Sequence, residues 1–365
     1  MKIAYDYNIF FSQKYGGISR YFCSIIKEII KEKGENQIKI FSPLFKNRYL
    51  LEISKKFRTG IYIPRFPTYN YLKTFVENTS FKQIKNSDFE IIHSTYYNSK
   101  IIDIKNKKKV ITVYDLIHEK FSKLYGKNNL YNKKKTIENA DHIICISENT
   151  KKDLLEYYNL DENKVSTIHL GFDHLSEDYS KLNFDNLLLP KNFILFVGSR
   201  EKYKNFDLLL EAYRSKKNIM NDFQIVCFGG GKFTKKEINK FNRFELIDKV
   251  KNYQGNDILL SYLYTKTQLF VFPSEYEGFG LPLIEAMSLN CPVLASENNT
   301  FIEIAKDSIH YFKNNSLEDL SFKIEFLLNS KNDLNSKKSK AFELSRQYTW
   351  KKCTKKTLEI YKKLI

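Results

Sequence analysis

The sequence lacks any apolar run that approaches the roughly 18–20 residues needed to span a bilayer as a helix. Its N-terminus passes from Met1 directly into Lys2-Ile-Ala-Tyr, without the apolar region and cleavage site of a secretory signal. We therefore expect a cytoplasmic protein.

Cysteine pairs are also lacking. The chain has five scattered cysteines and no C-x-x-C pair: Cys23, Cys145, Cys227, Cys291 and Cys353. This pattern indicates neither a disulfide framework nor a zinc site. We expect reduced, mostly buried thiols.

Internal repeats and low-complexity tracts are absent, and the composition is that of a globular protein. Hydrophobic residues make up 42% and charged residues 28% of the 365 residues. At roughly 100–200 residues per domain, this length favours two domains.

The net charge of +18 is unevenly distributed. Residues 1–140 contain 27 Lys and Arg against 12 Asp and Glu, which is +15 of the total. This basic half could contact an anionic membrane surface, an anionic acceptor or a nucleic acid, or it could simply be solvated surface. No aromatic-basic platform or binding motif supports the nucleic-acid alternative.

Short β-branched runs alternate with helical periodicity along the chain, which predicts parallel sheets covered by helices. The predicted strands of the first half are Ile3–Asp6, Gln37–Phe41, Gly60–Ile63, Phe89–His93, Lys109–Tyr114, His142–Ser147 and Val165–His169. Those of the second half are Phe193–Val197, Phe223–Phe228, Lys249–Tyr253, Leu269–Phe272, Pro292–Ala295 and Ile309–Phe312. The fold class is α/β, with two Rossmann-like, doubly wound domains that face each other across a cleft.

The domain boundaries follow from a change of character near the middle of the chain. We expect an N-terminal domain over 1–172, a linker over 173–190 and a C-terminal domain over 191–345. Residues 346–365 should form a helix that packs back on the N-terminal domain. Trp350, Leu358, Ile360, Tyr361 and Leu364 are its expected buried stripe.

The most informative stretch follows Leu269–Phe272 and reads Glu277-Gly-Phe-Gly-Leu-Pro-Leu-Ile-Glu285. A buried strand leads into a glycine-bearing loop, and Pro282 stands where a first helical residue is favoured. The start of such a helix favours a phosphate, and Gly278 and Gly280 allow close approach of a ligand. Glu285 is expected in the first turn. Alternatively, Glu285 only complements the helix dipole and Glu277 is solvated.

This segment resembles the E-x7-E motif of the retaining glycosyltransferase family 4, which has the two-domain GT-B fold. The resemblance implies that Glu285 holds the ribose hydroxyls of a nucleotide and that Glu277 lies beside the transferred sugar. It also implies that backbone amides contact donor hydroxyls and diphosphate. These amides belong to Gly278, Phe279, Gly280 and Leu281.

A second basic site, Val197-Gly-Ser-Arg-Glu-Lys-Tyr-Lys-Asn205, again lies between a strand and a helix. Arg200 and Lys204 could neutralise a diphosphate, or they could be solvated loop cations. In the family, an Arg commonly follows the glycine directly. Here Ser199 takes that place, Arg200 is shifted by one position, and Lys204 keeps its register.

The N-terminal half offers further candidates at strand ends. Gly16 and Gly17 match the family's glycine loop, which faces the donor diphosphate. Val113-Tyr-Asp-Leu-Ile-His118 resembles the family's T-x-H-D segment, with Tyr114 in the place of its His, Asp115 retained and His118 one turn later. Tyr114 could equally be a core residue and His118 a surface residue.

Three more residues are possible contacts of the base or the sugar. His93 stands at a strand end beside aromatic residues, Gly230 lies in the loop Phe228-Gly-Gly-Gly231, and Gln254 follows the next strand. The glycine loop could equally be a turn.

Together these features indicate a retaining transferase that moves a sugar from a nucleotide-diphosphate donor to a hydroxyl of a glycan or lipid-linked glycan. Glu277, Asp115 and His118 are the catalytic candidates. No Asp-x-Asp pair occurs in the sequence, so we expect neither metal nor other cofactor. Glu277 could be a nucleophile or could stabilise an oxocarbenium-like state. The alternatives are an epimerase or phosphorylase on the same fold, a silent partner subunit and, remotely, a nucleic-acid-binding protein.

Overall fold

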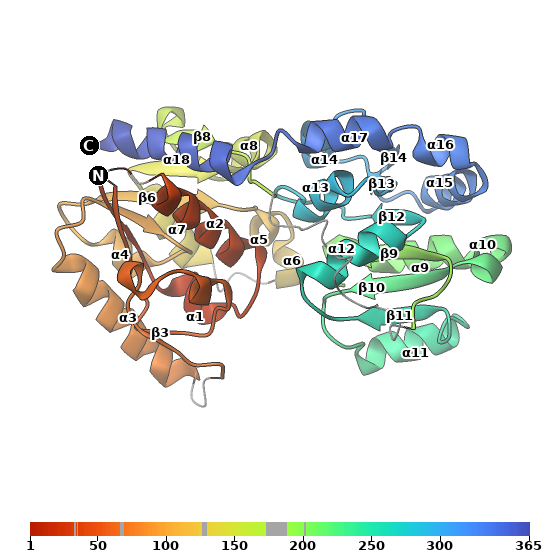
Figure 1. Ribbon diagram of the computed structural model, residues 1–365, viewed down its shortest axis with the longest axis horizontal. Coiled ribbons are helices and arrows are strands. Elements are labelled where there is room, and N and C mark those ends of the chain that lie inside the picture. Colours follow the sequence, from red (N-terminus) through yellow and green to blue (C-terminus); the bar gives the residue numbers. More distant parts are fainter. Residues whose placement is uncertain (33, 35, 66–68, 126–129, 173–187, 201) are drawn as a thin grey trace. The chain divides into compact units, whose positions relative to one another are not determined.

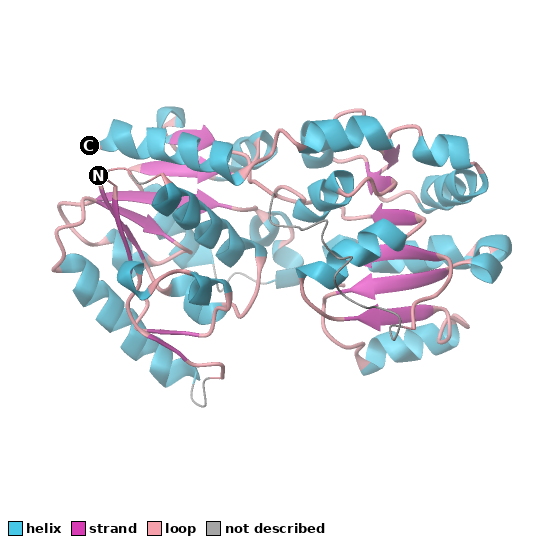
Figure 2. Cartoon of the chain, viewed as in Figure 1, coloured by secondary structure: helices cyan, strands magenta, loops and turns pink. Residues whose placement is uncertain are grey.

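The computed structural model describes all residues of the chain except 33, 35, 66–68, 126–129, 173–187 and 201. It divides into two compact units, one of Met1–Gly171 with Thr349–Ile365 and one of Phe172–Tyr348. In each unit, strands form a parallel sheet that is flanked by helices (Figures 1 and 2). The expected linker, 173–190, lies largely outside the described residues.

The sheet of the first unit has the strand order β2-β1-β5-β6-β7-β8 and is parallel throughout. Its strands are β1 (Lys2–Tyr5), β2 (Gln37–Ile40), β5 (Ile91–Ser94), β6 (Lys108–Val113), β7 (His142–Cys145) and β8 (Val165–Thr167). The helices are α1 (Asn8–Ser12), α2 (Gly17–Lys31), α3 (Tyr69–Lys85), α4 (Ser99–Ile102), α5 (Ile117–Lys120), α6 (Ser122–Tyr125), α7 (Leu130–Glu138), α8 (Glu148–Tyr157) and α18 (Trp350–Leu364). Strand order changes direction between β1 and β5, where ligands bind in open α/β sheets.

The sheet of the second unit has the order β11-β10-β9-β12-β13-β14, also parallel, and its switch point lies between β9 and β12. Its strands are β9 (Phe193–Val197), β10 (Gln224–Phe228), β11 (Val250–Tyr253), β12 (Leu269–Phe272), β13 (Val293–Ser296) and β14 (His310–Phe312). The helices are α9 (Phe206–Arg214), α10 (Lys217–Asp222), α11 (Lys235–Arg243), α12 (Asp257–Lys266), α13 (Leu281–Ser288), α14 (Asn299–Ala305), α15 (Leu317–Asn329), α16 (Lys331–Asn335) and α17 (Lys338–Ser345).

Every predicted strand segment overlaps an observed strand, with bounds that differ by a few residues at most, because continuous β-branched and aromatic runs suit strands buried on both faces. Gly60–Ile63 is a partial exception. Its strand β4 (Ile61–Tyr62) joins β3 (Leu44–Phe45) in a separate two-stranded sheet instead of the main sheet. Strand β3 was not predicted, because it is too short to show a period.

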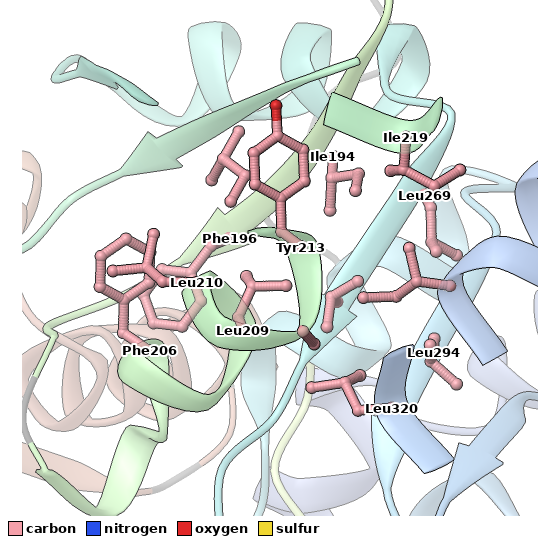
Figure 3. Packing of buried hydrophobic residues seen from close by; sticks show 14 of the residues in the cluster. Ile194, Phe196, Phe206, Leu209, Leu210, Tyr213, Ile219, Leu269, Leu294 and Leu320 are labelled. Carbon is pink, nitrogen blue, oxygen red and sulfur yellow. The ribbon is translucent and has the colours of Figure 1, made fainter. Parts of the chain in front are cut away.

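The core of the second unit forms around α9. Phe206, Leu209, Leu210 and Tyr213 recur at helical spacing and all are buried. Figure 3 shows these side chains gathered with Ile194 of β9, and the same cluster extends to α15. The helical period seen in the sequence is thus the face that covers the sheet.

Helix α18 belongs to the first unit, where it packs against α2. Trp350, Leu358, Ile360 and Tyr361 are buried as expected, and Leu364 is half-buried. Gly171 permits the close approach of the chain to α18, because a Cβ there would lie 2.2 Å from the backbone nitrogen of Trp350.

All five cysteines are free and buried, as predicted. No helix within the described part of the chain is both long and apolar enough to cross a bilayer.

Candidate functional site

Lys204 and Glu277 form a largely buried ion pair in the second unit. Lys204 closes a short 3-10 turn after β9, and Glu277 lies in the loop after β12, so the switch point brings together residues 73 positions apart. Lys204 Nζ lies 2.5 Å from Glu277 Oε1, and the side chains retain 13% and 11% of their exposure. Thr300 Oγ1 also donates to the Glu277 carbonyl at 2.7 Å. The charged pair therefore lies where the carboxyl ends of the central strands β9 and β12 meet.

The turn into α13 depends on Gly280. Its φ is +92°, and a Cβ there would come within 2.8 Å of the Phe301 ring. Gly280 caps the helix, so Leu281 is the first helical residue and Pro282 the second. Glu285 consequently falls in the second turn, and the expectation of a first-turn position is wrong by about one residue.

Glu285 is buried at 7% exposure. Tyr264 Oη of α12 donates to Glu285 Oε2 at 3.3 Å and to the Pro282 carbonyl at 3.2 Å. Phe279 is buried and packs edge-on against Tyr348, with ring centroids 6.0 Å apart. Tyr264 was not predicted as a site residue, because an aromatic residue in an apolar helix carries no sign of a polar role.

Arg200 lies after β9, but its guanidinium is engaged within the protein. Nε donates to Glu237 Oε1 at 2.5 Å, and Nη1 and Nη2 donate to carbonyls of the loop 229–232. Its side chain is only 4% exposed. In this arrangement Nε, Nη1 and Nη2 each donate to a protein acceptor, and the expected contact of Arg200 with a diphosphate stays a prediction. Gly230 belongs to the loop that Arg200 holds.

Gln254 follows β11 and is exposed, with Nε2 donating to Asn252 Oδ1 at 3.3 Å. Because β9, β10, β11 and β12 are parallel, their carboxyl ends meet at one edge. The residues that follow these strands, namely Lys204, Gly230, Gln254 and Glu277, therefore share that edge.

The glycine pair of the first unit stands at the start of α2. Gly16 caps this helix, and Gly17 is its exposed first residue. Arg20 stacks on Tyr49, with the guanidinium carbon 4.6 Å from the ring centroid, and donates to Tyr49 Oη at 2.6 Å.

A pocket of about 230 Å³ opens at the switch point of the first unit. It is lined by Asn8, Ser12, Lys73, Tyr96, Tyr97, His118, Leu130, Asn132 and Lys133. His118 thus lines a pocket, and its role there stays a prediction. Tyr96 and Tyr97 are the aromatic residues that follow His93 in the sequence, and burial raises the pKa of Tyr96 to about 12.

Asp115 and Tyr114 lie beside this pocket without lining it. Asp115 Oδ1 accepts from the Ile117 amide at 3.1 Å, and its carbonyl accepts from Lys133 Nζ at 2.9 Å. Tyr114 is 7% exposed and packs edge-on against Tyr21, which is the core position considered as its alternative.

His93 is fully buried, so its suggested contact with base or sugar is corrected. Nδ1 lies 2.6 Å from Tyr361 Oη of α18, and Nε2 lies 2.8 Å from Thr112 Oγ1. Burial lowers the pKa of His93 to about 3, so the ring is neutral. Nδ1 therefore joins α18 to the sheet, and Nε2 joins β5 to β6.

Two families match the chain. "Glycosyltransferase Family 4" matches residues 15–174, and "Glycosyl transferases group 1" matches residues 180–343. The chain is 23% identical to the O-antigen chain mannosyltransferase B of Escherichia coli over 382 residues, covering 95% of this chain and 96% of that protein.

A further relative matches a shorter stretch. It is the N-acetylgalactosamine-N,N'-diacetylbacillosaminyl-diphospho-undecaprenol 4-alpha-N-acetylgalactosaminyltransferase of Campylobacter jejuni, 28% identical over 161 residues, which cover 44% of this chain and 42% of that protein.

Among solved structures, the sucrose-phosphate synthase of Thermosynechococcus elongatus superposes with a TM-score of 0.78 at 19% identity, covering 99% and 98% of the two chains. The match confirms the GT-B fold. With both of its units matched by these families, the chain belongs to the glycosyltransferases of the family 4 type.

Proposed function

We propose that this glycosyltransferase moves a hexose or a similar sugar from a nucleotide-diphosphate donor to a hydroxyl of a glycan or lipid-linked glycan, with retention at the anomeric carbon and without a metal ion. The bond from the anomeric carbon to the phosphate oxygen breaks, and a bond to the acceptor oxygen forms. The acceptor proton leaves with the diphosphate.

The observation that carries this proposal is the buried pair of Lys204 and Glu277 at the switch point of the second unit. A buried cation next to a carboxylate can serve a ligand that is anionic at one end and rich in hydroxyls at the other. Lys204 would share its charge with the diphosphate, and Glu277 would then face the sugar.

Glu285 would hold the ribose. One of its oxygens already accepts from Tyr264, and a carboxylate can accept several hydrogen bonds. Two adjacent ribose hydroxyls suit this group because they donate without requiring a counter-charge. The start of α13 adds backbone donors near the diphosphate.

The acceptor would bind in the pocket of the first unit. Tyr96 and Tyr97 offer ring surfaces, and Asn8, His118 and Asn132 offer polar groups. Aromatic rings beside polar groups suit a sugar ring, which has apolar C–H patches between its hydroxyls. Gly16 and Gly17 at the start of α2 would meet the donor diphosphate, as the family resemblance implies.

The sugar can be narrowed by the relatives' names, which describe mannosyl and N-acetylgalactosaminyl transfer. GDP-mannose is accordingly the first donor to test, followed by UDP-N-acetylhexosamines. One relative's name also includes a diphospho-undecaprenol acceptor. A lipid-linked acceptor would explain the basic N-terminal half, which would contact an anionic inner membrane face.

The test combines donor screening with an acceptor requirement. Thermal shift with a panel of nucleotide sugars identifies the donor, and release of nucleoside diphosphate is then followed with and without lipid-linked glycan. Release that depends on acceptor supports transfer. Conversion of donor alone would indicate an epimerase, and orthophosphate-dependent cleavage a phosphorylase.

Three further measurements address the finer claims. The one-bond carbon–proton NMR coupling at the new anomeric centre gives its configuration, and comparison with the configuration of the donor distinguishes retention from inversion. Turnover after exhaustive treatment with EDTA tests metal independence. Co-sedimentation with vesicles containing anionic lipid, repeated at high salt, tests membrane contact.

A further inference from the structure

In the second unit, the guanidinium of Arg200 donates hydrogen bonds to four consecutive carbonyl groups. Arg200 Nη1 donates to the carbonyl of Gly229 at 3.2 Å, and Nη2 donates to those of Gly230, Gly231 and Lys232 at 3.3, 3.2 and 3.3 Å. The guanidinium carbon also lies 4.9 Å from the ring centroid of Phe233. Arg200 thus contacts the loop 229–232 along its whole length.

These contacts fix more than four oxygen atoms. A peptide group is planar, so a carbonyl that is held in one direction sets the orientation of the next amide as well. Holding four successive carbonyls therefore orients the backbone of the entire loop.

The loop needs such a constraint because it begins with three glycines. Gly229, Gly230 and Gly231 have φ values of +85°, +67° and +74°, in the left-handed region that glycine samples freely. A Cβ at position 230 would come within 2.8 Å of Arg200 Nη1 and of the Gly198 carbonyl. Glycine therefore admits the guanidinium, and the guanidinium in turn selects one loop conformation.

Glu237 holds Arg200 in place. Its Oε1 accepts from Arg200 Nε, and its Oε2 accepts from the amide and the hydroxyl of Thr234 at 2.7 Å each. Burial alone would raise the pKa of Glu237, but these hydrogen bonds lower it below its ordinary value. The same residues form the capping box of α11, so the clamp is anchored on a helix.

The clamped loop adjoins the end of β11. The amide of Gly229 donates to the Tyr253 carbonyl at 3.3 Å, and Asn252 Nδ2 donates to the Gly229 carbonyl at 3.4 Å. Gln254, the possible contact of the nucleotide base, follows directly. The loop therefore forms part of the wall that the nucleoside would meet.

We infer that Arg200 is a positioning residue for the nucleoside part of the donor, acting through the loop 229–232 and held by Glu237. This inference rests on the proposed donor site. The shift of Arg200 by one position from the family's usual arginine acquires a physical meaning, because the side chain serves the loop and leaves the diphosphate to Lys204.

The test uses Arg200→Gln and Arg200→Lys in the full chain, with Glu237→Gln as a second way to release the clamp. Arg243→Gln is the matched control, since Arg243 is an exposed arginine of α11 that stacks on Phe244 at 5.1 Å. Hydrogen–deuterium exchange reports the amides of residues 229–233. Calorimetry measures binding of UMP, UDP, GMP and GDP, and melting temperatures separate unfolding from local loosening.

Arg200→Gln should accelerate exchange in this loop and weaken a nucleoside monophosphate and its diphosphate by the same factor, about tenfold to a hundredfold. Glu237→Gln should give a smaller loss of the same kind, and Arg243→Gln none. In steady state, the donor KM should rise while kcat stays within about twofold. If Arg200→Gln does not fold, Arg200→Lys and Glu237→Gln carry the same comparison.

A loss confined to the diphosphates would overturn the inference, because it would show direct contact between Arg200 and phosphate. Unchanged exchange and affinity would overturn it as well. If the unmodified protein bound none of these four nucleotides and none of the corresponding adenine, cytosine and thymine nucleotides, the proposed function would fail, and the positioning role with it. Normal binding by the unmodified protein with normal binding by the variants would reject the positioning role alone.

Discussion

In the first unit, Asp6 after β1 and His93 of β5 are buried among hydrogen-bond partners and form no ion pair within the described residues, whereas in the second unit Lys204 and Arg200, which follow β9, are each paired with a carboxylate. The first unit does contain one buried ion pair away from β1 and β5, between Lys133 at its pocket and Glu119. Asp6 is fully buried, accepts from the amide and hydroxyl of Thr95, and has its pKa raised to about 6 by burial. His93 is neutral. In contrast, Lys204 lies against Glu277, and Arg200 against Glu237.

The difference matches the two ligands that a glycosyltransferase must bind. A donor carries a diphosphate. A cation that is already buried in an ion pair can interact with that charge without a further cost of desolvation. A neutral sugar hydroxyl needs hydrogen bonds and ring surfaces instead. The following experiments test this contrast, from the largest expected effect to the smallest.

Because His93 is neutral in the folded protein, we expect the free energy of unfolding to depend on pH. The folded pKa near 3 lies below the ordinary 6.5, so the unfolded chain binds more protons between these values and stability is lost as the pH falls through them. The full span corresponds to up to about 5 kcal/mol. At pH 6.5, His93→Gln should be less stable than wild type. As the pH falls towards 3, the difference between their free energies of unfolding, measured with urea, should shrink.

Asp6 makes the stability depend on pH in the opposite direction. Its raised pKa means that the folded chain binds more protons between the ordinary 3.8 and about 6, so stability falls as the pH rises through that window. Removing His93 should therefore expose this downward trend. Unfolding free energies of wild type and His93→Gln that ran parallel across the whole range would refute the neutral assignment.

Glu277→Gln should abolish most turnover, by about a thousandfold in kcat, while donor binding changes little. The substitution keeps the shape but removes the charge at the proposed sugar position. Glu275→Gln is the control, since Glu275 lies in the same loop and its recorded hydrogen bonds use only its backbone. Equal turnover in Glu277→Gln and wild type would sink the assignment.

Glu285→Ala should raise the donor dissociation constant by about tenfold, with a smaller effect on kcat. It removes the proposed acceptor of the ribose hydroxyls, which Tyr264 also contacts. Calorimetry with the nucleoside diphosphate and with free diphosphate separates the two donor parts. Only the nucleoside diphosphate should weaken, and an equal loss for both would reject the ribose role.

His118→Ala should raise the acceptor KM a few-fold and leave the donor KM unchanged, because His118 lines the pocket of the first unit. The change is the smallest because the histidine is one of several groups in that pocket. His169→Ala provides a control outside it. A rise in donor KM with an unaltered acceptor KM would show that this pocket serves the donor and would contradict its assignment to the acceptor.

Much of the fold was predictable because local patterns and tertiary demands agree. The run Phe193–Val197 is apolar at every position, and it forms β9 with all five residues buried. Trp350–Leu364 shows the helical stripe in sequence and forms α18 over the same bounds. Where the local signal is short, as at Leu44–Phe45, prediction missed the strand.

The site was less predictable, since its side chains are held by partners remote in sequence. Arg200 and Lys204 look alike in one loop, yet one reaches Glu237 and the other Glu277. The Thr234-x-x-Glu237 spacing is a capping-box signal that could have drawn attention to Glu237. No local sequence pattern predicts that His93 contacts Tyr361, which lies 268 positions away.

The sequence alone determined the two parallel-sheet units, the helix after Gly280 and the two carboxylates, Glu277 before that helix and Glu285 within it, because these follow from short-range periodicity and backbone preference. Only the tertiary structure decided which charges are paired, that His93 is interior, and that Arg200 holds a loop. Those outcomes depend on burial and on the ends of strands meeting at one edge, and neither property is encoded in neighbouring residues.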